Sequence, residues 1–332
     1  MPLETDLSSL LVDLKLIVPG EVVDAAPLPG GVSSDIVLVT TASGRRFCIK
    51  RALPRLKVAT LWEAPVGRNA AEAKWLRTVA RWLPEVVPAL IADDPGRGLF
   101  AMEYLPADTH PVWKGELLAG HADAAFSRAV GAALVSIHGH SAAKPALAAA
   151  FDNETIFEPI RIEPYLRATA RAHPDLAERL ERLAERTLAT RLALIHGDVS
   201  PKNILHGPQG PVFLDAECAC WGDPAFDLAF CLTHLLLKGA LREDHRVAYL
   251  GCFAAFARAY LDGVTWEARE AIEGRAADLV QAFLLARVDG RSPVEYLDEP
   301  RRDWVRQAAR TMLLGRTKTL DTIADLWSRL RA

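Results

Sequence analysis

Three polar residues in the segment 194–227 have the types and the spacing that phosphoryl transfer requires. Asp198 follows an apolar run, Asn203 comes five residues later, and a second apolar run leads directly to Asp215. A carboxylate at Asp198 can accept the proton of a hydroxyl group. The amide oxygen of Asn203 and the carboxylate of Asp215 can hold Mg²⁺ on nucleotide phosphates. The segment is therefore predicted to contain a proton acceptor and a magnesium site.

The interval from Asp198 to Asn203 equals that of the protein-kinase catalytic loop, but the neighbouring residues differ from that loop. Gly197 stands where protein kinases have arginine, and Ala216-Glu217 stand where they have Phe-Gly. In the alternative interpretation, these polar residues only cap the ends of two strands. Three of them at kinase spacings between two strand-like runs favour the catalytic interpretation.

The longer pattern HGD-x₄-N, LD-x-E and GDP-x₂-DLA resembles the aminoglycoside phosphotransferase-like small-molecule kinases. That group includes kinases for antibiotics, choline, homoserine and methylthioribose. The resemblance implies an α+β, bilobal protein-kinase-like fold that uses ATP and Mg²⁺. It also implies that Asp227 braces the catalytic loop through hydrogen bonds to the backbone, and that His196 orients the same loop. Asp223, which precedes Pro224, is typical of a helix N-cap.

The first hundred residues are expected to supply the other half of an ATP site. Lys50 ends a predicted strand, as the lysine of the VAIK motif does, and Glu72 on the following helix is its predicted ion-pair partner. Gly31, Ser33 and Ser34 lie in the loop before that strand and are predicted to cover the phosphates, since glycine permits close backbone approach and serine donates hydrogen bonds. A plain hairpin turn is the alternative for this loop. For Lys50 and Glu72, the alternative is a surface lysine and a solvated glutamate on the helix.

The resemblance also implies a hinge at the end of the last strand of this half. There the backbone C=O of Glu103 and the backbone N–H of Leu105 would contact the adenine edge.

The apolar periodicity predicts a small antiparallel β lobe over residues 1–105 and a larger, mainly helical lobe over 106–332. We expect strands at 22–23, 36–41, 46–50, 87–92 and 99–104. We expect helices at 7–17, 68–83, 122–140, 164–189, 224–238, 242–261, 265–286 and 301–314. The segment 105–120 is read as the connection between the lobes.

The acceptor is expected to bind in the second lobe, because the first is committed to ATP. A segment with a glycine and a proline interrupts the helical pattern there and gathers Arg287, Asp289 and Arg291. These residues are candidate substrate contacts, as is Glu217, although a solvated loop is the alternative. The charges of the last hundred residues are roughly balanced, so an acidic pocket for a polycationic antibiotic is not favoured. The Trp113-Lys114-Gly115 segment resembles the segment that links the lobes in methylthioribose kinases. The catalytic-loop motif HGDVSPKN, in contrast, differs from the HGDLHTGS that is usual in those kinases.

Composition limits the other classes of function. The 332 residues carry a net charge of −3, which gives no reason to expect a nucleic-acid partner. No apolar run reaches the length expected of a membrane span, and the acidic residues near the N-terminus do not suit an export signal. Five cysteines in apolar runs suggest reduced thiols and a cytoplasmic location. The oligomeric state is not predicted.

Three hypotheses about function stay open. The first is an ATP-dependent phosphotransferase acting on a hydroxyl group of a small metabolite or antibiotic, with Asp198 as base. The second is a kinase-fold protein that binds nucleotide without turnover, and the presence of Asp198, Asn203 and Asp215 argues against it. The third is a kinase that acts on a protein. The short interval from Asp215 to Pro224 leaves no room for a long activation loop and disfavours it.

Overall fold

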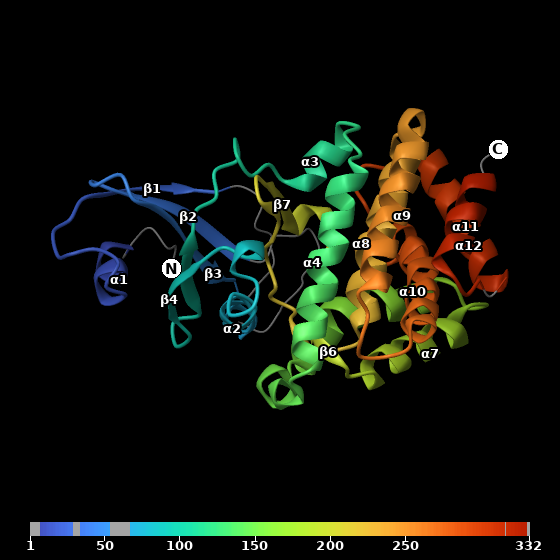
Figure 1. Cartoon of the computed structure of the whole chain (residues 1–332), viewed down its shortest axis with the longest axis horizontal. Coiled ribbons are helices and arrows are strands. Elements are labelled where there is room, and N and C mark those ends of the chain that lie inside the picture. Colours follow the sequence, from blue (N-terminus) through green and yellow to red (C-terminus); the bar gives the residue numbers. More distant parts are fainter. Residues whose placement is uncertain (1–6, 29–33, 54–66, 316, 331–332) are drawn as a thin grey trace.

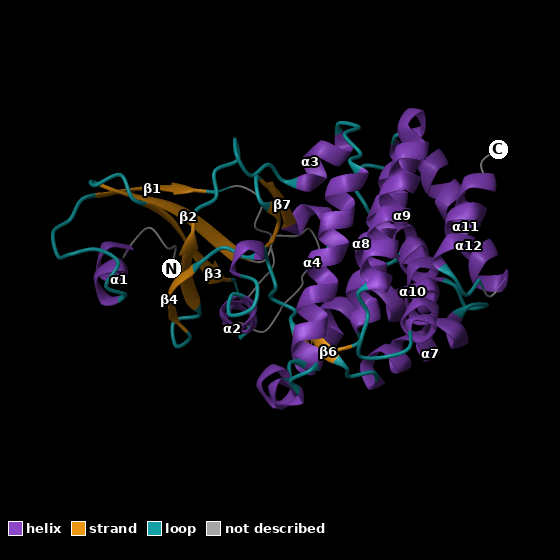
Figure 2. Ribbon diagram, in the orientation of Figure 1, coloured by secondary structure: helices purple, strands orange, loops and turns teal. Residues whose placement is uncertain are grey.

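The computed structural model describes residues 7–28, 34–53, 67–315 and 317–330. It has two lobes, a sheet-rich one built from the first hundred residues and a helical one built from the rest (Figures 1 and 2). The predicted α+β bilobal fold is confirmed. The expected boundary near residue 105 falls in the connection between strand β5, Leu99–Glu103, and helix α3, Trp113–Leu118.

The small lobe is a five-stranded antiparallel sheet in the order β1-β2-β3-β5-β4. The remaining strands are β1 Val23–Pro27, β2 Ser34–Thr41, β3 Arg46–Ala52 and β4 Leu90–Asp94.

Side-chain alternation along β3 divides the small lobe into two cores. Phe47 and Ile49 pack with helix α1, Leu7–Asp13, on one face. Cys48 packs on the other face in the same cluster as helix α2, Arg68–Val79. Because successive strand residues point to opposite faces, Lys50 also lies on the α2 face, which adjoins the large lobe.

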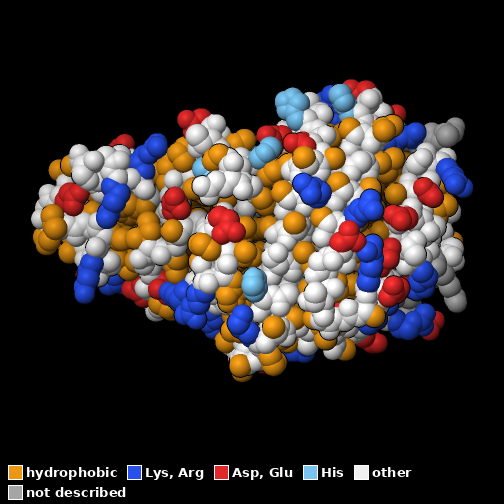
Figure 3. All heavy atoms as spheres, viewed as in Figure 1, with side chains coloured by type: hydrophobic (Ala, Val, Ile, Leu, Met, Phe, Trp, Pro, Cys, Tyr) orange, Lys and Arg blue, Asp and Glu red, His pale blue; other side chains and the backbone are white. Residues whose placement is uncertain are grey.

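The large lobe surrounds one long buried helix, α8, Pro224–Leu241, on which α9 and α10 pack. Its other helices are α3 Trp113–Leu118, α4 Ala124–Ala142, α5 Glu154–Phe157, α6 Ala168–Ala172, α7 Ala177–Ala189, α9 Arg246–Asp262, α10 Arg269–Asp289, α11 Glu299–Gly315 and α12 Leu320–Arg329. Short 3₁₀ turns lie at Pro84–Val86, Pro145–Phe151, Pro201–Asn203 and Glu243–His245, and a π-helical segment, η4, spans Glu158–Arg167. On the helical lobe, acidic and basic side chains are interspersed over the face shown in Figure 3.

Two small antiparallel pairs hold the loops that carry the kinase-like motifs. Strand β6, Ala193–Ile195, pairs with β9, Cys220–Gly222, and strand β7, Ile204–Gly207, pairs with β8, Gly210–Phe213. The loop from His196 to Asn203 joins the two pairs, and Asp215 follows the end of β8. The chemistry-bearing residues therefore sit at the ends of short strands, directly beneath the small lobe.

Several predicted element boundaries are wrong. The helix predicted over 164–189 is divided into η4, α6 and α7, because Pro174 cannot continue the hydrogen-bond ladder after α6. Helix α3 lies inside the segment read as a connection, and α12 was not predicted. Helix α10 continues to Asp289, so Arg287 lies in its last turn rather than in a loop.

Helix α8 also corrects the expectation about apolar runs. Its length and composition would allow it to cross a membrane, but 94% of it is buried inside the protein. The apolar residues cover all sides of this helix because it is the centre of the helical lobe, packed against α9 and α10.

Candidate functional site

Asp227 fixes the backbone of the loop that carries Asp198. The Asp227 carboxylate is fully buried in the first turn of α8. It accepts hydrogen bonds from the backbone N–H groups of His196 at 2.7 Å and Gly197 at 2.8 Å, and His138 Nε2 lies 3.2 Å away. This is the bracing arrangement that the family resemblance implies. These hydrogen bonds tie the loop to the buried helix α8.

Gly197 explains why the arginine of the protein-kinase loop is absent. Its φ is +78°, a conformation that L-residues with side chains seldom adopt. A Cβ at this position would also lie 2.7 Å from the backbone oxygen of Cys218. The loop therefore passes against the Asp215–Cys218 segment too closely for any residue other than glycine.

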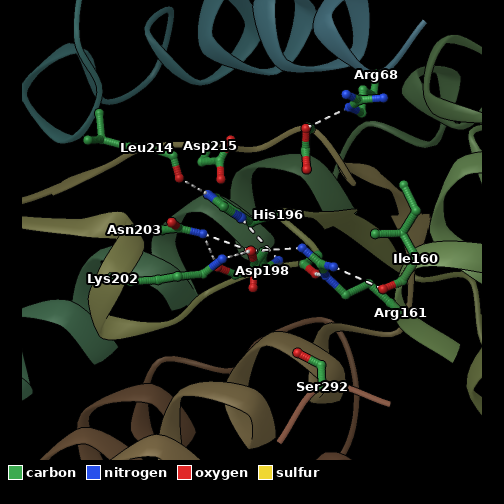
Figure 4. A network of polar contacts seen from close by, with 12 residues as sticks. Arg68, Ile160, Arg161, His196, Asp198, Lys202, Asn203, Leu214, Asp215 and Ser292 are labelled. Atoms are coloured by element: carbon green, nitrogen blue, oxygen red, sulfur yellow. Dashed lines mark hydrogen bonds and ion pairs between the residues drawn. The ribbon is translucent and has the colours of Figure 1, made fainter. Parts of the chain in front are cut away.

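Asp198 is 2% exposed and lies at the centre of the polar network in Figure 4. Its Oδ2 atom lies 2.7 Å from Arg161 Nη2 and 3.1 Å from Lys202 Nζ, and it accepts a 2.9 Å hydrogen bond from Asn203 Nδ2. All three contacts use the same oxygen. Within the described part of the chain, Oδ1 has no hydrogen-bond or ion-pair partner.

The surroundings of Asp198 keep it ionised. Burial opposes a charged carboxylate, but Arg161 and Lys202 outweigh burial and hold the pKa of Asp198 below its ordinary value. A carboxylate with a low pKa is a weak proton acceptor. It can nevertheless orient a hydroxyl group throughout the reaction, which is the main requirement of a loose phosphoryl-transfer transition state.

Arg161 and Lys202 were not singled out from the sequence. Arg161 lies in η4, almost forty residues before Asp198, and its Nε donates to the Gly197 backbone oxygen at 2.6 Å. Nothing in the local sequence distinguishes it from other arginines, since only the packing of η4 brings it to the loop. Lys202 could have been singled out from the sequence, because it follows Asp198 by four residues in a loop that ends in a single helical turn.

His196 orients the loop from inside. Its Nε2 atom lies 3.0 Å from the Leu214 backbone oxygen, and its Nδ1 atom accepts from the Asp198 backbone N–H at 3.2 Å. This pair of contacts requires the neutral ring protonated on Nε2. Burial lowers the pKa of His196, which agrees with a neutral ring. His196 therefore links the two motif-bearing loops and does not carry a mobile proton.

Lys50, Glu72 and Asp215 meet where the lobes face each other. Lys50 Nζ lies 2.7 Å from Glu72 Oε2 and 2.5 Å from Asp215 Oδ1, and the lysine is 3% exposed. Burial opposes the ammonium charge, but Asp215 and Glu72 raise the pKa of Lys50 above its ordinary value. Lys50 is thus a fixed cation between the two lobes, and a lysine held by a glutamate in this way binds nucleotide phosphates in kinases.

The donor set formed by Asp215 and Asn203 suits a hard cation such as Mg²⁺. Lys50 and Lys202 hold the pKa of Asp215 below its ordinary value despite burial, so this carboxylate is charged. The backbone at Asp215 has φ +65°, a strained value for a residue other than glycine, and such strain is common at functional sites. Asn203 Nδ2 donates to both the backbone oxygen and Oδ2 of Asp198, which turns its Oδ1 away from them. One carboxylate and one amide oxygen are ordinary Mg²⁺ ligands alongside phosphate and water.

The other small-lobe candidates are only partly described. Gly31 and Ser33 lie outside the described residues. Ser34 starts β2, and its buried hydroxyl has no hydrogen-bond partner among the residues that the structure describes. Glu103 ends β5 and its carboxylate accepts from the Ala89 backbone N–H at 3.2 Å. Leu105 follows in the connection, so the expected adenine contacts stay predictions.

Glu217 pairs with Arg68 rather than facing open space. Arg68 Nε lies 2.9 Å from Glu217 Oε2, and both side chains are buried. Arg68 begins α2, the helix that also carries Glu72. The pair therefore connects the start of α2 in the small lobe to the segment that follows Asp215. This placement gives no support to a direct contact between Glu217 and an acceptor.

A cavity of about 100 Å³ opens beside Asp198 between the catalytic loop, α3, η4, α8 and the end of α10. Figure 4 shows Ser292, which lines it, facing the Asp198 cluster from the side opposite Asp215. Its lining residues are Lys114, Tyr165, Asp198, Lys202, Phe230, His234, Lys238, Arg287, Ser292, Glu295 and Tyr296.

Of the three predicted acceptor contacts in the 287–296 segment, Arg287 lines this cavity. Asp289 is instead held by Arg306 at 2.8 Å and His173 at 2.9 Å, and Arg291 is not part of the lining. The structure therefore does not bring Asp289 and Arg291 to this cavity. Arg287 and Asp289 lie two positions apart in the last turn of α10, so their side chains point to different sides of the helix.

A family model described as the phosphotransferase enzyme family matches residues 24–263. The match covers well over half of the chain and includes every motif described above. The chain therefore belongs to the phosphotransferase enzyme family.

Relatives with assigned activities are similar to parts of this chain. A methylthioribose kinase from Enterobacter sp. (strain 638) is 26% identical over 247 residues, which cover 66% of this chain and 61% of that kinase. The match thus spans about three-fifths of that relative's length. Among solved structures, an ethanolamine kinase from Plasmodium vivax is similar with a TM-score of 0.61 at 12% identity, covering 94% of this chain and 89% of that one. A macrolide 2′-phosphotransferase from Brachybacterium faecium is similar with a TM-score of 0.53 at 18% identity, covering 99% of both chains. At identities this low, the similarity to the solved structures shows a shared fold and nothing further.

Proposed function

We propose that this member of the phosphotransferase enzyme family transfers the γ-phosphoryl group of ATP to a hydroxyl group of a small molecule. The observation that carries the proposal is the position of Asp198. One of its oxygens is held by three donors, while the other is left for the cavity described above. The curated relatives named methylthioribose kinase support a small molecule as acceptor.

In this proposal each residue has one role. Lys50, held by Glu72, neutralises the phosphates of ATP. Mg²⁺, bound by Asp215 and Asn203, would neutralise the charge on the β- and γ-phosphates. Asp198 Oδ1 accepts the hydrogen bond of the acceptor hydroxyl and orients its oxygen toward the γ-phosphorus.

The atoms balance without a further reactant. The acceptor oxygen forms a bond to the γ-phosphorus while the bond from that phosphorus to the β,γ-bridging oxygen breaks, and ADP leaves. The hydroxyl proton passes to Asp198 and from there to solvent. Arg161 and Lys202 keep Asp198 ionised before the reaction, and Lys202 adds positive charge next to the transferred group.

The experiment is to incubate the purified protein with Mg·ATP and a panel of hydroxyl-bearing metabolites and antibiotics. Phosphorylated product is detected by mass spectrometry and ADP by a coupled assay. We expect ADP and phosphorylated acceptor in equal amounts for at least one compound. Tight Mg·ATP binding with no phosphorylated product across the panel would contradict the proposal and favour a nucleotide-binding protein without turnover.

A further inference from the structure

The cavity beside Asp198 has an excess of positive charge. Two carboxylates line it, Asp198 and Glu295. They face four cationic side chains, contributed by four separate parts of the fold: Lys114, Lys202, Lys238 and Arg287.

Among the described residues, two of these cations form ion pairs with carboxylates and two do not. Lys202 pairs with Asp198 at 3.1 Å, and Lys114 pairs with Glu295 at 2.5 Å. The hydrogen bonds of Arg287 go to neutral oxygens of Tyr165 and Ser292. Within the described ranges, neither Lys238 nor Arg287 forms an ion pair with a carboxylate, although Glu295 attracts both from a longer distance.

Lys238 is the more unusual of the two, because it is 1% exposed on the central helix α8. Its ammonium lies 5.2 Å from the centre of the Tyr296 ring, and it has neither a hydrogen bond nor an ion pair in the part of the chain that the structure describes. Burial, together with Lys114 and Arg287, lowers the pKa of Lys238 to about 7. A buried ammonium without an anion is costly to a folded protein, so a reason for its presence is expected in function.

Neutral polar groups beside Lys238 are also unsatisfied. His234 precedes it by one helical turn, and the two residues, together with Phe230, line the cavity from one face of α8. His234 Nδ1 and Tyr296 Oη are buried, and no described residue hydrogen-bonds to them. Two polar atoms of residues that line the cavity therefore lack a hydrogen-bond partner among the described residues, in addition to the two cations without an ion pair.

We infer that the acceptor substrate is a small anion, a hydroxylated carboxylate or a phosphomonoester, whose negative group is bound by Lys238 and Arg287 while its hydroxyl group meets Asp198. This inference rests on the proposed function and names its substrate class. Charge-assisted hydrogen bonds to Lys238 and Arg287 would satisfy both cations at once. An amino alcohol or an aminoglycoside would instead place its positive charge against them. The volume of about 100 Å³ is below the range of about 300–1,000 Å³ typical of sites for drug-sized ligands, which favours a small molecule.

The test is a binding measurement that does not depend on turnover. The protein is saturated with Mg²⁺ and a non-hydrolysable ATP analogue, so that added anions cannot bind at the nucleotide phosphates. Calorimetry and thermal melting then compare matched compounds of three to six carbons: hydroxy acids such as glycerate, phosphomonoesters such as glycerol 3-phosphate, their neutral parents such as glycerol, and the cation choline. We expect anions to bind at least tenfold more tightly than their neutral parents, and the stronger of the two anion classes identifies the charged group.

Variants tie the binding to the cavity. Lys238→Met keeps a similar length without the charge, and both it and Arg287→Met should abolish the preference for anions. Lys144→Met is the matched control, since Lys144 is exposed and lies outside the cavity. Equal binding of anions and neutral parents by the wild-type protein would overturn the inference. An anion preference unchanged in Lys238→Met would do so as well.

Failure of this inference and failure of the proposed function give different results. Transfer of phosphate from ATP only to neutral or cationic alcohols would overturn the anionic substrate and leave the phosphotransferase standing. Anion binding that requires Lys238, without phosphorylation of any bound anion, would support the anion site and count against the phosphotransferase.

Discussion

Arg161 Nη2 lies 2.7 Å from Asp198 Oδ2, and both side chains are buried. The same arginine donates through Nε to the backbone oxygen of Gly197. One residue from η4 therefore fixes the conformation of the loop and the charge of its aspartate together. In the proposed reaction Arg161 is a positioning residue, since it acts through Asp198.

Replacement of Arg161 tests that role through pH. Arg161 helps to hold the pKa of Asp198 below its ordinary value, so its loss should raise that pKa, because burial then acts with less opposition. In Arg161→Met the acidic limb of the kcat/KM profile should move to higher pH, and kcat/KM at pH 7 should fall by about 10- to 100-fold. Arg161→Lys should recover part of the activity and of the profile. A lower rate with an unmoved acidic limb would show that Arg161 supports the fold alone.

Replacement of Lys50 or Glu72 should weaken the binding of nucleotide rather than the binding of the acceptor. In Lys50→Met a buried cation that contacts Asp215 is lost, and we expect Mg·ATP to bind about 10- to 100-fold more weakly, in line with about 1.5–3 kcal/mol for hydrogen bonds to charged groups. Glu72→Gln should have a smaller effect in the same direction, because an amide still accepts a hydrogen bond from Lys50. Calorimetric titration with Mg·ATP measures both, and the exposed Lys144→Met serves as control. Unchanged Mg·ATP affinity in Lys50→Met would remove Lys50 from the nucleotide site.

Asp215 should act through the metal. Asp215→Ala leaves Asn203 as the single proposed protein ligand, so the affinity for Mg·ATP should fall by at least tenfold while the affinity for adenosine changes little. Titration of each ligand into the variant separates the two effects. Equal losses for Mg·ATP and adenosine would instead indicate that the variant disturbs the nucleotide site as a whole.

Lys238 should reduce stability in a pH-dependent way. Its pKa is lowered to about 7 in the folded protein from an ordinary value of 10.5. The charged groups that face it are Lys114, Arg287 and Glu295. Between pH 7 and 10.5 the unfolded chain holds a proton on this lysine that the folded chain lacks, so this residue makes stability rise with pH. Its destabilising effect is therefore largest at and below pH 7 and disappears above pH 10.5.

Lys238→Met should accordingly raise the free energy of unfolding by about 1–3 kcal/mol at pH 7, and by less at pH 9.5. Urea denaturation at the two pH values measures this difference, with Lys144→Met as the control that should change little. A stabilised variant that no longer binds the acceptor would show a residue kept for function at the expense of stability. Destabilisation at pH 7 would show that Lys238 already has a compensating partner.

The two-lobe fold could be predicted from the sequence, and so could the site residues that lie close to one another along the chain. Asp198, Asn203 and Asp215 lie at fixed spacings next to strand ends, and Lys50 lies in β3 with Glu72 on the next helix, so local patterns place them. Gly197 was recorded as a departure from the protein-kinase pattern, and its reason, the approach of Cys218, needed the packed structure.

Residues that act across long intervals were not predictable in this way. Arg161 meets Asp198 because η4 packs against the catalytic loop, which no local pattern indicates. Lys238 was expected only as the last residue of a helix over 224–238, and its burial depends on the packing of α10 and Tyr296 around it. Asp289 was grouped with Arg287 because they are close in sequence. Two positions apart at a helix end, they point to different neighbours.

The most direct test of the proposed reaction is the Asp198→Asn variant. The substitution keeps the shape of the side chain but removes its charge and its capacity to take a proton. With an acceptor found in the panel, phosphorylated product formed per unit time should fall by about 10²- to 10⁴-fold, while Mg·ATP affinity and thermal stability stay close to those of the wild-type protein. Transfer at the wild-type rate by this variant would contradict the assignment of Asp198 as the residue that receives the acceptor hydroxyl.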